Sequence, residues 1–360
     1  MLDGDDLNDW LVDQLQSGSI DLVAPTSDYV AHAITAAHQR LGIVMPGHPT
    51  AAAMRDCLFK DRFALRMAEV GFPAPPAAAP RSLAEAEQMA AELGYPVVSK
   101  PRSHIGVGLT RGRVFRDPEE LFKEFRPYHL FKTHAALGGE EPELGFPMLQ
   151  KFMSHDHVDV VSVTGCLDRD GELVAFAHNR KLRAWPPALG IGSRFEALGE
   201  QPFTDRAVAA VQHVLGTGLF ELEVLLDRQT GEGWPIDLNP RAWGQITLAG
   251  ANGCDMPTAW YEVVTGTSVR RPRALRRRPR YWQSGVNFYP AAVLSIVSGP
   301  ERRPRVRELT SAVRQPRVGA SLDWRDPGPG IVAAITALVR LPQTVRAYFR
   351  YRRRDPSRHV

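Results

Sequence analysis

The chain has 360 residues, a formal net charge of +4, and 44% hydrophobic and 23% charged residues. This composition excludes a disordered or fibrous protein, and the length predicts two or three compact lobes. Three cysteines without a CxxC pair exclude a disulfide framework and favour a reducing compartment, so we expect a cytoplasmic protein. The N-terminus is acidic, and the longest apolar stretches are shorter than the roughly 18–20 residues of a membrane span. We therefore expect neither secretion nor a membrane-spanning segment.

Charge is distributed unevenly along the chain. Residues 270–360 contain 21 Arg and five acidic residues, a net charge of +16. Residues 1–269 contain 23 basic and 35 acidic residues, a net charge of −12. The two parts are therefore expected to present different surfaces. An acidic body with a basic tail is not the pattern of a protein whose core binds nucleic acid, and no nucleic-acid partner is expected.

A short α/β segment is predicted at the start of the chain. Brief strands are expected at Asp21–Ala24 and at Ile43–Pro46. Between them, Asp28 is a suitable N-cap for a helix that Gly42 ends.

The next segment combines helix and strand signals with a glycine-bearing loop. Ser82 and Glu85 form a capping box for a helix. The compact apolar strand PVVSKP follows, with Lys100 at its end, and the loop SHIGVG leads from it into a second strand. Asp117, followed by Pro, starts another helix.

The second half of the chain changes to antiparallel strands. FPMLQKFM, HVDVVSVTGCL and ELVAFAHNRKL have strand character, and Asp170-Gly171 is a strong hairpin signal. A helix around Thr204–Leu215 precedes two further strands, FELEVLLD and WPIDLNPR, which the turn RQTGEG joins. The charged run Arg270–Arg280 marks the end of this body.

Acidic and amide side chains gather on these last two predicted strands. Residues two apart in a strand face the same side, so Glu221 and Glu223 share a face, as do Asp237 and Asn239. A hairpin that brings Glu223 beside Asp237 and Asn239 supplies the oxygen ligands that Mg²⁺ takes in proteins. Arg241 adds a fixed cation where a phosphate or carboxylate could bind. An ordinary hairpin with exposed acids is the alternative, and the Asn and Pro of DLNPR weigh against it.

These motifs resemble those of ATP-grasp enzymes, of the carboxylate–amine ligase kind related to carbamoyl phosphate synthetase, over about residues 58–264. The family pattern is an acidic strand, a turn and E-x-N-P-R, where this chain has Glu223, a turn and Asp237-Leu238-Asn239-Pro240-Arg241. Asp237 stands where the family usually has a second Glu. The resemblance implies an α/β (α+β) ATP-grasp fold, in which two lobes clamp the nucleotide. It also implies ATP and Mg²⁺ as cofactors, with Mn²⁺ as an alternative ion, and Glu223, Asp237 and Asn239 as metal ligands.

The resemblance also assigns the phosphate contacts. YPVVSKP resembles the family's strand that presents a lysine to the α- and β-phosphates, so Lys100 is expected there. Lys60, in FKDRF, resembles the earlier nucleotide-binding lysine. SHIGVG, with Ser103, Gly106 and Gly108, occupies the place of the phosphate-covering glycine loop. An ordinary β-turn is the alternative for that loop.

Base and ribose contacts follow from the same resemblance. MLQKFM resembles the interlobe hinge, where the backbone of Gln150, Lys151 and Phe152 would hold adenine, although the family more often has Glu at Gln150. An acidic ribose contact is expected nearby, with Asp159 as the candidate. His155, His157 and Asp159 also alternate along a strand, so a transition-metal site or a solvated strand face are the alternatives.

An arginine segment completes the expected site. NRKLRAWPPALGIGS resembles the family's R-x-R-x-x-P-x-x-G segment near the γ-phosphate and the acceptor, and Arg180 and Arg183 match it. Arg183 and Arg241 are the predicted catalytic residues, which would steady negative charge in the transition state.

Four domains are predicted from these motifs. They are a partial α/β domain at 1–56, a lysine-presenting small lobe at 57–150, a C-terminal lobe with the metal site at 151–268, and a basic extension at 269–360. The extension ends in GIVAAITALVRLPQTVRAYFRYRRR, which has apolar residues at near-helical spacing. It could dock on the acidic body, form a contact in a homo-oligomer, or lie on anionic lipid at the inner membrane face.

The predicted activity is ATP-dependent ligation of a small-molecule carboxylate to an amine through an acylphosphate, with release of ADP and phosphate. The alternative is a catalytically weak nucleotide-binding sensor or scaffold whose basic tail finds a membrane or a partner. Biotin-dependent carboxylation shares the ATP site but ranks third, because the chain shows no biotin-carrying module.

Overall fold

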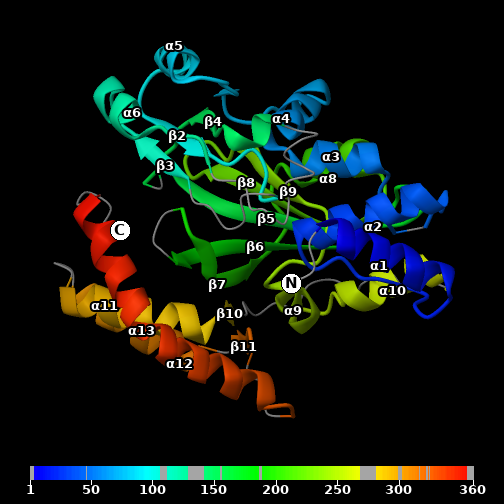
Figure 1. The fold of residues 1–360 in the computed structure, drawn as a ribbon. Coiled ribbons are helices and arrows are strands. Elements are labelled where there is room, and N and C mark those ends of the chain that lie inside the picture. Colours follow the sequence, from blue (N-terminus) through cyan, green and yellow to red (C-terminus); the bar gives the residue numbers. More distant parts are fainter. Residues whose placement is uncertain are drawn as a thin grey trace. The chain divides into compact units, whose positions relative to one another are not determined.

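The computed structural model describes residues 4–45, 47–105, 112–128, 142–154, 156–185, 189–267, 281–298, 302–315, 317–321, 323 and 325–354. The chain divides into two compact units (Figure 1). Unit 1 comprises Met1–His178, Glu200–Trp243 and Asp255–Pro272, and unit 2 comprises Asn179–Gly199, Gly244–Cys254 and Arg273–Val360.

Two helices open unit 1, α1 (Gly4–Gln16) and α2 (Asp28–Leu41). Apolar residues of both helices, among them Leu11 and Ile34, form a buried cluster. Ser27, one residue before the predicted cap Asp28, is the N-cap, and its hydroxyl accepts the Val30 N–H at 3.2 Å. Gly42 ends α2 in the left-handed conformation, as predicted.

The two strands predicted in this region do not form. Asp21–Ala24 has no regular structure, and neither do residues 43–45, while Pro46 lies outside the described residues. The first segment instead places Val23 against the cluster between α1 and α2. A four-residue segment needs a neighbouring strand for its backbone hydrogen bonds, and the helices beside it offer none.

A small antiparallel sheet carries the first lysine motif of unit 1. Its strand order is β1-β4-β2-β3. The strands are β1 (Ala77–Ala78), β2 (Val97–Lys100), β3 (Arg113–Phe115) and β4 (Met148–Lys151). Helices α5 (Leu83–Leu93) and α6 (Pro118–Glu124) pack against it, and their apolar side chains form a buried cluster with Val97 and Leu149 of the sheet (Figure 1). Asp117 caps α6 and Ser82 caps α5, as the sequence predicts.

A second set of antiparallel strands in unit 1 carries the acidic motif. The strands β5 (Val158–Leu167), β8 (Gly218–Asp227) and β9 (Gly233–Asn239) lie side by side in the order β5-β8-β9 (Figure 1). The first half of β6 (Leu173–Trp185) flanks β5. The surrounding helices of unit 1 are α3 (Ala51–Leu58), α4 (Lys60–Glu69), α8 (Thr204–Leu215) and α10 (Met256–Thr265).

Unit 2 contains most of the described part of the basic extension, folded onto two strands of the preceding segment. The strand order β11-β10-β7 leads to the second half of β6, and β10 pairs antiparallel with β7. The strands are β7 (Ile191–Leu198), β10 (Tyr281–Gln283) and β11 (Arg317–Gly319). The helices are α9 (Ile246–Ala251), α11 (Gly285–Ser298), α12 (Arg302–Arg314) and α13 (Gly328–Arg354).

One arginine is buried inside unit 2. Arg194 on β7 is only 3% exposed and donates hydrogen bonds to the side-chain oxygens of Gln283 and Gln315. Its guanidinium lies 4.7 Å from the ring centre of Tyr281 and 5.5 Å from that of Phe288. Burial lowers the pKa of Arg194 from its ordinary value. This side chain therefore joins β7, β10 and the end of α12 without a hydrogen-bonded carboxylate in the described residues.

Over the described residues, no helix combines the length and the apolar character needed to cross a membrane.

Candidate functional site

The β8–β9 hairpin places four polar side chains on one face. In its register, Glu221 lies opposite Asn239 and Glu223 lies opposite Asp237. Cross-strand neighbours share a face and have Cβ atoms about 4.5–5.5 Å apart, so two carboxylates meet at Glu223 and Asp237. The register shifts between Glu223 and Val224, where Val224 lies opposite Pro235. A bulge at this point accommodates a proline, which has no N–H for the ladder.

Glu221 and Asn239 are held by a chain of hydrogen bonds. Ser162 donates to Glu221 at 3.0 Å, and the Asn239 amide donates to Glu221 at 3.2 Å. Arg241 donates to the Asn239 side-chain oxygen at 2.8 Å and also pairs with Asp28 on α2. The amide oxygen of Asn239 therefore already has a partner, and Arg241 is fixed in place. Glu221 belongs to this cluster, although the predicted ligand set omits it; its position two residues before Glu223 was the available signal.

Asp237 is surrounded by basic side chains. Lys60, the first residue of α4, donates from its ammonium group to Asp237. The Lys60 side chain is 9% exposed and that of Asp237 is 20% exposed. Burial acts to raise the pKa of Asp237, but the charges of Lys60, His104 and Lys100 outweigh burial and hold that pKa below its ordinary value. His104 is a residue that the sequence motifs did not single out, although it lies in the quoted loop.

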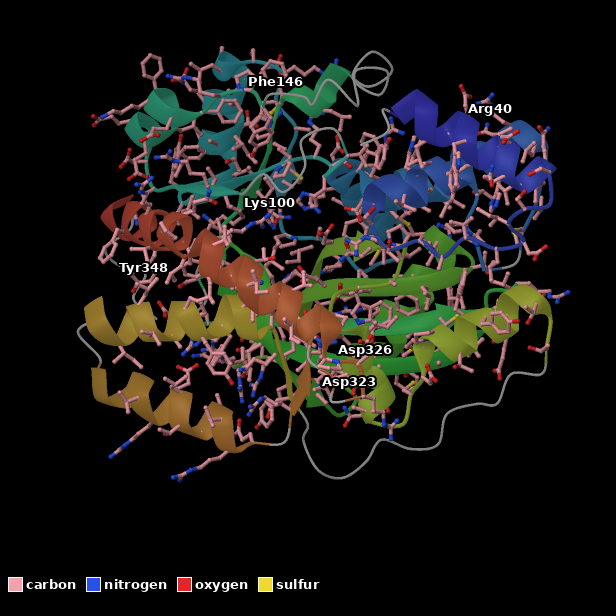
Figure 2. The ribbon with its side chains drawn as sticks, turned by 60° about the horizontal axis from the view of Figure 1, so that its bottom comes forward. Arg40, Lys100, Phe146, Asp323, Asp326 and Tyr348 are labelled. Carbon is pink, nitrogen blue, oxygen red and sulfur yellow. The ribbon has the colours of Figure 1, made fainter. Side chains whose placement is uncertain are left out.

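Lys100 joins this cluster from the end of β2, where Figure 2 labels it. Its ammonium donates to the Gln150 side-chain oxygen at 2.8 Å. Gln150 is buried on the adjacent strand β4 and donates in turn to the Pro75 carbonyl at 3.5 Å. This contact orients Lys100, whose positive charge helps to hold down the pKa of Asp237.

The predicted hinge uses two of its backbone donors within the protein. The Lys151 N–H donates to the Pro76 carbonyl at 2.8 Å, and the Phe152 N–H donates to the Pro96 carbonyl at 3.1 Å. The Lys151 ammonium donates to the Gly94 carbonyl at 2.7 Å. These two N–H groups therefore have partners within the protein. The assignment of adenine to the backbone of Gln150, Lys151 and Phe152 stays a prediction.

The phosphate-covering loop is described only in part. Ser103 is buried, and its hydroxyl accepts the Ile105 N–H at 3.2 Å, which makes a local turn. Gly106 and Gly108 lie outside the described residues.

Asp159 lies on the face of β5 opposite to the acidic cluster. Ser162 lies opposite Glu223, so the β5 residues on the acidic face are Ser162 and those two positions away in either direction. Asp159 is three positions away and faces the other side, where its carboxylate pairs with Arg228 at 3.0 Å. The assignment of Asp159 to the ribose stays a prediction.

The alternative transition-metal site does not form among the described residues. His155 lies outside the described residues, and within the described ranges no three His, Cys, Asp or Glu residues form a metal-binding group.

Arg183 belongs to unit 2, whereas the cluster around Asp237 belongs to unit 1. Two nitrogens of its guanidinium group donate to the Glu308 carboxylate on α12, with Nε at 2.6 Å. Arg180 pairs with Glu196 at 2.7 Å in the same unit. Both arginines are therefore held by carboxylates of their own unit. Glu308 lies 125 positions from Arg183 in the sequence, and Glu196 lies 16 positions from Arg180.

The residues around Asp237 suit Mg²⁺ only together with a bound molecule that supplies further oxygen atoms. Glu223 and Asp237 supply two carboxylates, and Mg²⁺ usually takes one or two carboxylates plus phosphate oxygens and water. Asn239 would have to release its oxygen from Arg241 to join them. The donor set fits a metal that arrives with a nucleotide.

Comparison with known proteins yields relatives by sequence and by fold. No family model matches the chain. The carbamoyl phosphate synthase large chain of Thermus thermophilus is 26% identical over 213 residues, which are 59% of this chain and 20% of that protein. The chain thus spans about a fifth of the length of the curated relatives that it matches.

Solved structures share the fold. Rhizobium etli pyruvate carboxylase has a TM-score of 0.58 at 22% identity, covering 72% of this chain and 23% of that one. The biotin carboxylase domain of Hydrogenobacter thermophilus 2-oxoglutarate carboxylase, solved with MgADP, ADP and bicarbonate, has a TM-score of 0.58 at 17% identity, covering 73% and 57%. Biotin carboxylase of Campylobacter jejuni, in complex with an ATP analogue, has a TM-score of 0.57 at 17% identity, covering 73% and 58%. These structures show that the chain has an α+β fold of the ATP-grasp type.

Proposed function

We propose that this protein binds MgATP and ligates a small-molecule carboxylate to an amine. The observation that carries the proposal is the cluster in unit 1, where Lys60, Lys100 and His104 surround Asp237 beside Glu223. Such a site offers cations to phosphate oxygens and carboxylates to a divalent ion within a few ångströms. Phosphoryl transfer depends mainly on this kind of positioning and charge stabilisation.

Two lysines would bind the phosphates. Lys60 is held on the first turn of α4 and Lys100 at the end of β2, so both approach from rigid elements. Lys60 donates to Asp237, and Lys100 donates to Gln150. A triphosphate would replace these partners and use the charges that the protein already holds in place. His104 would add a third donor.

Mg²⁺ would bind to Glu223, Asp237 and Asn239. Glu221 would orient Asn239 by accepting a hydrogen bond from its amide. When bound, the ion would neutralise charge on the β- and γ-phosphate oxygens. Mn²⁺ has the same ligand preference and is the alternative.

The reaction would run in two steps. A carboxylate oxygen attacks the γ-phosphorus, the bond to ADP breaks, and an acylphosphate forms. An amine nitrogen then attacks the acyl carbon, phosphate leaves, and the nitrogen loses a proton to give an amide. Arg241, fixed by Asp28 and Asn239, would stabilise developing negative charge, and Arg183 is proposed for the same role at the acceptor.

The first experiment is a screen of carboxylates and amines for ADP release, with amide products identified by mass spectrometry. Bicarbonate belongs in the screen because one structural neighbour was solved with it. Asp237→Ala is expected to lower amide formation by about a hundredfold or more, as for loss of a group that organises transition-state charge. Asp170→Ala, an exposed aspartate in a turn, is the matched control and should retain full activity.

Two results would contradict the proposal. Undiminished turnover by Asp237→Ala would remove Asp237 from the metal site. Tight binding of MgATP with no product from any acid and amine would favour the sensor or scaffold alternative. Calorimetry with a non-hydrolysable ATP analogue separates that case from a failure to bind nucleotide.

A further inference from the structure

Two alanines and one tyrosine of helix α13 face inward. Ala333 and Ala337 are half-buried, and Tyr348 is 6% exposed. Tyr348, labelled in Figure 2, stacks on Trp185 of β6 with ring centres 6.0 Å apart and an interplanar angle of 7°. These residues fall on one side of the helix, since they are spaced by four and eleven positions. That side fixes α13 to unit 2.

The large aliphatic side chains of α13 point away from that packed side. Ile331 and Ile335 are each 56% exposed, Val332 is 64%, Leu338 is 70% and Val339 is 73% exposed. Their spacing of one, four, seven and eight positions makes a continuous stripe along two turns of helix. An amphipathic helix of a soluble protein normally buries this stripe and exposes its small and polar residues. The orientation of α13 is the reverse, which marks a surface built for contact.

The charges of α13 all have one sign. Residues 328–354 contain six Arg and no acidic residue. Arg340 stands alone in the first half, and the other five lie between Arg346 and Arg354. The acids Asp323 and Asp326 precede the helix (Figure 2). The helix therefore begins with an apolar stripe and ends in a basic segment.

We propose that α13 is a membrane-docking helix that lies flat in the interface of an anionic lipid bilayer. Its aliphatic stripe would enter the boundary of the acyl chains, and its arginines would contact lipid phosphates and carboxylates. A second copy of this chain is a poorer occupant of the same face. Two α13 helices packed through their stripes would bring twelve arginines together with no acid on either helix to neutralise them. Nucleic acid would pair with the arginines but leave the aliphatic stripe in water. This inference is independent of the proposed ligase activity.

The test is flotation of the full-length protein with vesicles of phosphatidylcholine alone and of phosphatidylcholine with about one-third phosphatidylserine. We expect binding to the anionic vesicles only, weakened by salt. Leu338→Ser with Val339→Ser should lower the partition coefficient about tenfold or more, because apolar groups leave the lipid. Ala334→Ser with Thr336→Ser changes two other exposed positions of the same helix and should bind like the unmodified protein. Arg346→Gln should lower binding about fivefold, the value of one arginine near an anionic surface.

Each other outcome overturns the proposal. Equal binding of the two double variants would show that the stripe does not enter lipid. If a protein with its normal circular dichroism spectrum binds to neither vesicle, a lipid bilayer is excluded as the partner of α13. Light scattering that detects a dimer broken by Leu338→Ser with Val339→Ser would identify the second copy as the occupant.

Discussion

The two units bury positive charge in different ways. In unit 1, the buried Lys60 ammonium contacts a carboxylate, Asp237, which has further cations around it. In unit 2, the buried Arg194 donates to the neutral oxygens of Gln283 and Gln315 and lies against aromatic rings. An ion pair of the first kind can be opened by a ligand that brings its own charges. The second kind offers nothing for a ligand to replace. The difference separates a site poised for binding from a structural cross-link.

Acid should act on unit 1 far more than on unit 2. Burial lowers the pKa of His178 to about 4, and burial together with the charge of His38 lowers the pKa of His48 to about 4. Both histidines are in unit 1 and are neutral when folded, whereas in the unfolded chain they take up a proton near pH 6.5. Stability is therefore expected to fall as pH drops from about 6.5 to about 4, by about 3 kcal/mol for each histidine.

Hydrogen exchange measured by mass spectrometry at pH 7 and pH 5 would resolve this loss by segment. Protection should fall in unit 1 and persist around β7 and β10 of unit 2. His178→Gln should lose its own share of the pH dependence. An equal fall of protection in both units would contradict the comparison. The Asp237 carboxylate contributes in a separate window, because its lowered pKa means that its stabilisation is lost only below about pH 4.

Breaking the ion pair of unit 1 should have the next largest effect. Lys60→Met leaves Asp237 without its nearest cation and is expected to cost about 3 kcal/mol of unfolding free energy, since a partly buried carboxylate loses its partner. Denaturant titration measures this cost, with the exposed Lys123→Met as the control.

Adding Mg²⁺ sharpens the same experiment. Because the Asp237 carboxylate is released from Lys60, Mg²⁺ alone should raise the melting temperature of Lys60→Met more than that of the unmodified protein. An equal shift in both proteins would mean that Asp237 does not contact the ion.

Arg194→Met should have the smallest effect of the three. It removes two hydrogen bonds and leaves two buried amide oxygens without their donor, which costs about 2 kcal/mol. Nucleotide affinity should not change. Arg314→Met, at an exposed position of α12, makes the same change of charge and should be neutral. Loss of nucleotide binding in Arg194→Met would place this residue in the site and end the distinction between the units.

Local patterns predicted the parts of the molecule whose contacts are close in sequence. The β8–β9 hairpin follows from period-two acids and a glycine-bearing turn, and it accounts for the pairing of Glu223 with Asp237. The helix caps at Ser82 and Asp117 follow from residues three positions apart. The fold class follows from these motifs in order, and the solved relatives confirm it.

Contacts between residues far apart in the sequence could not be predicted from local patterns. The partner of Arg183 lies 125 residues away, and the partner of Lys60 lies 177 residues away. The face of Asp159 depends on the register of β5 against β8, which the sequence of β5 does not specify. The hinge N–H groups of Lys151 and Phe152 are taken by proline carbonyls that no motif indicates.

The bulge after Glu223 makes the tip of the β8–β9 hairpin a convenient place to label the protein. The acidic pairs lie on one side of the bulge, and the turn at Asp227–Gly231 lies beyond the other side, about 13 Å from Glu223 along the strand. Strand register at the acids is fixed by their own ladder and not by the length of the turn. A fluorophore or short tag inserted between Gln229 and Thr230 should therefore report on the protein without moving the acidic pairs.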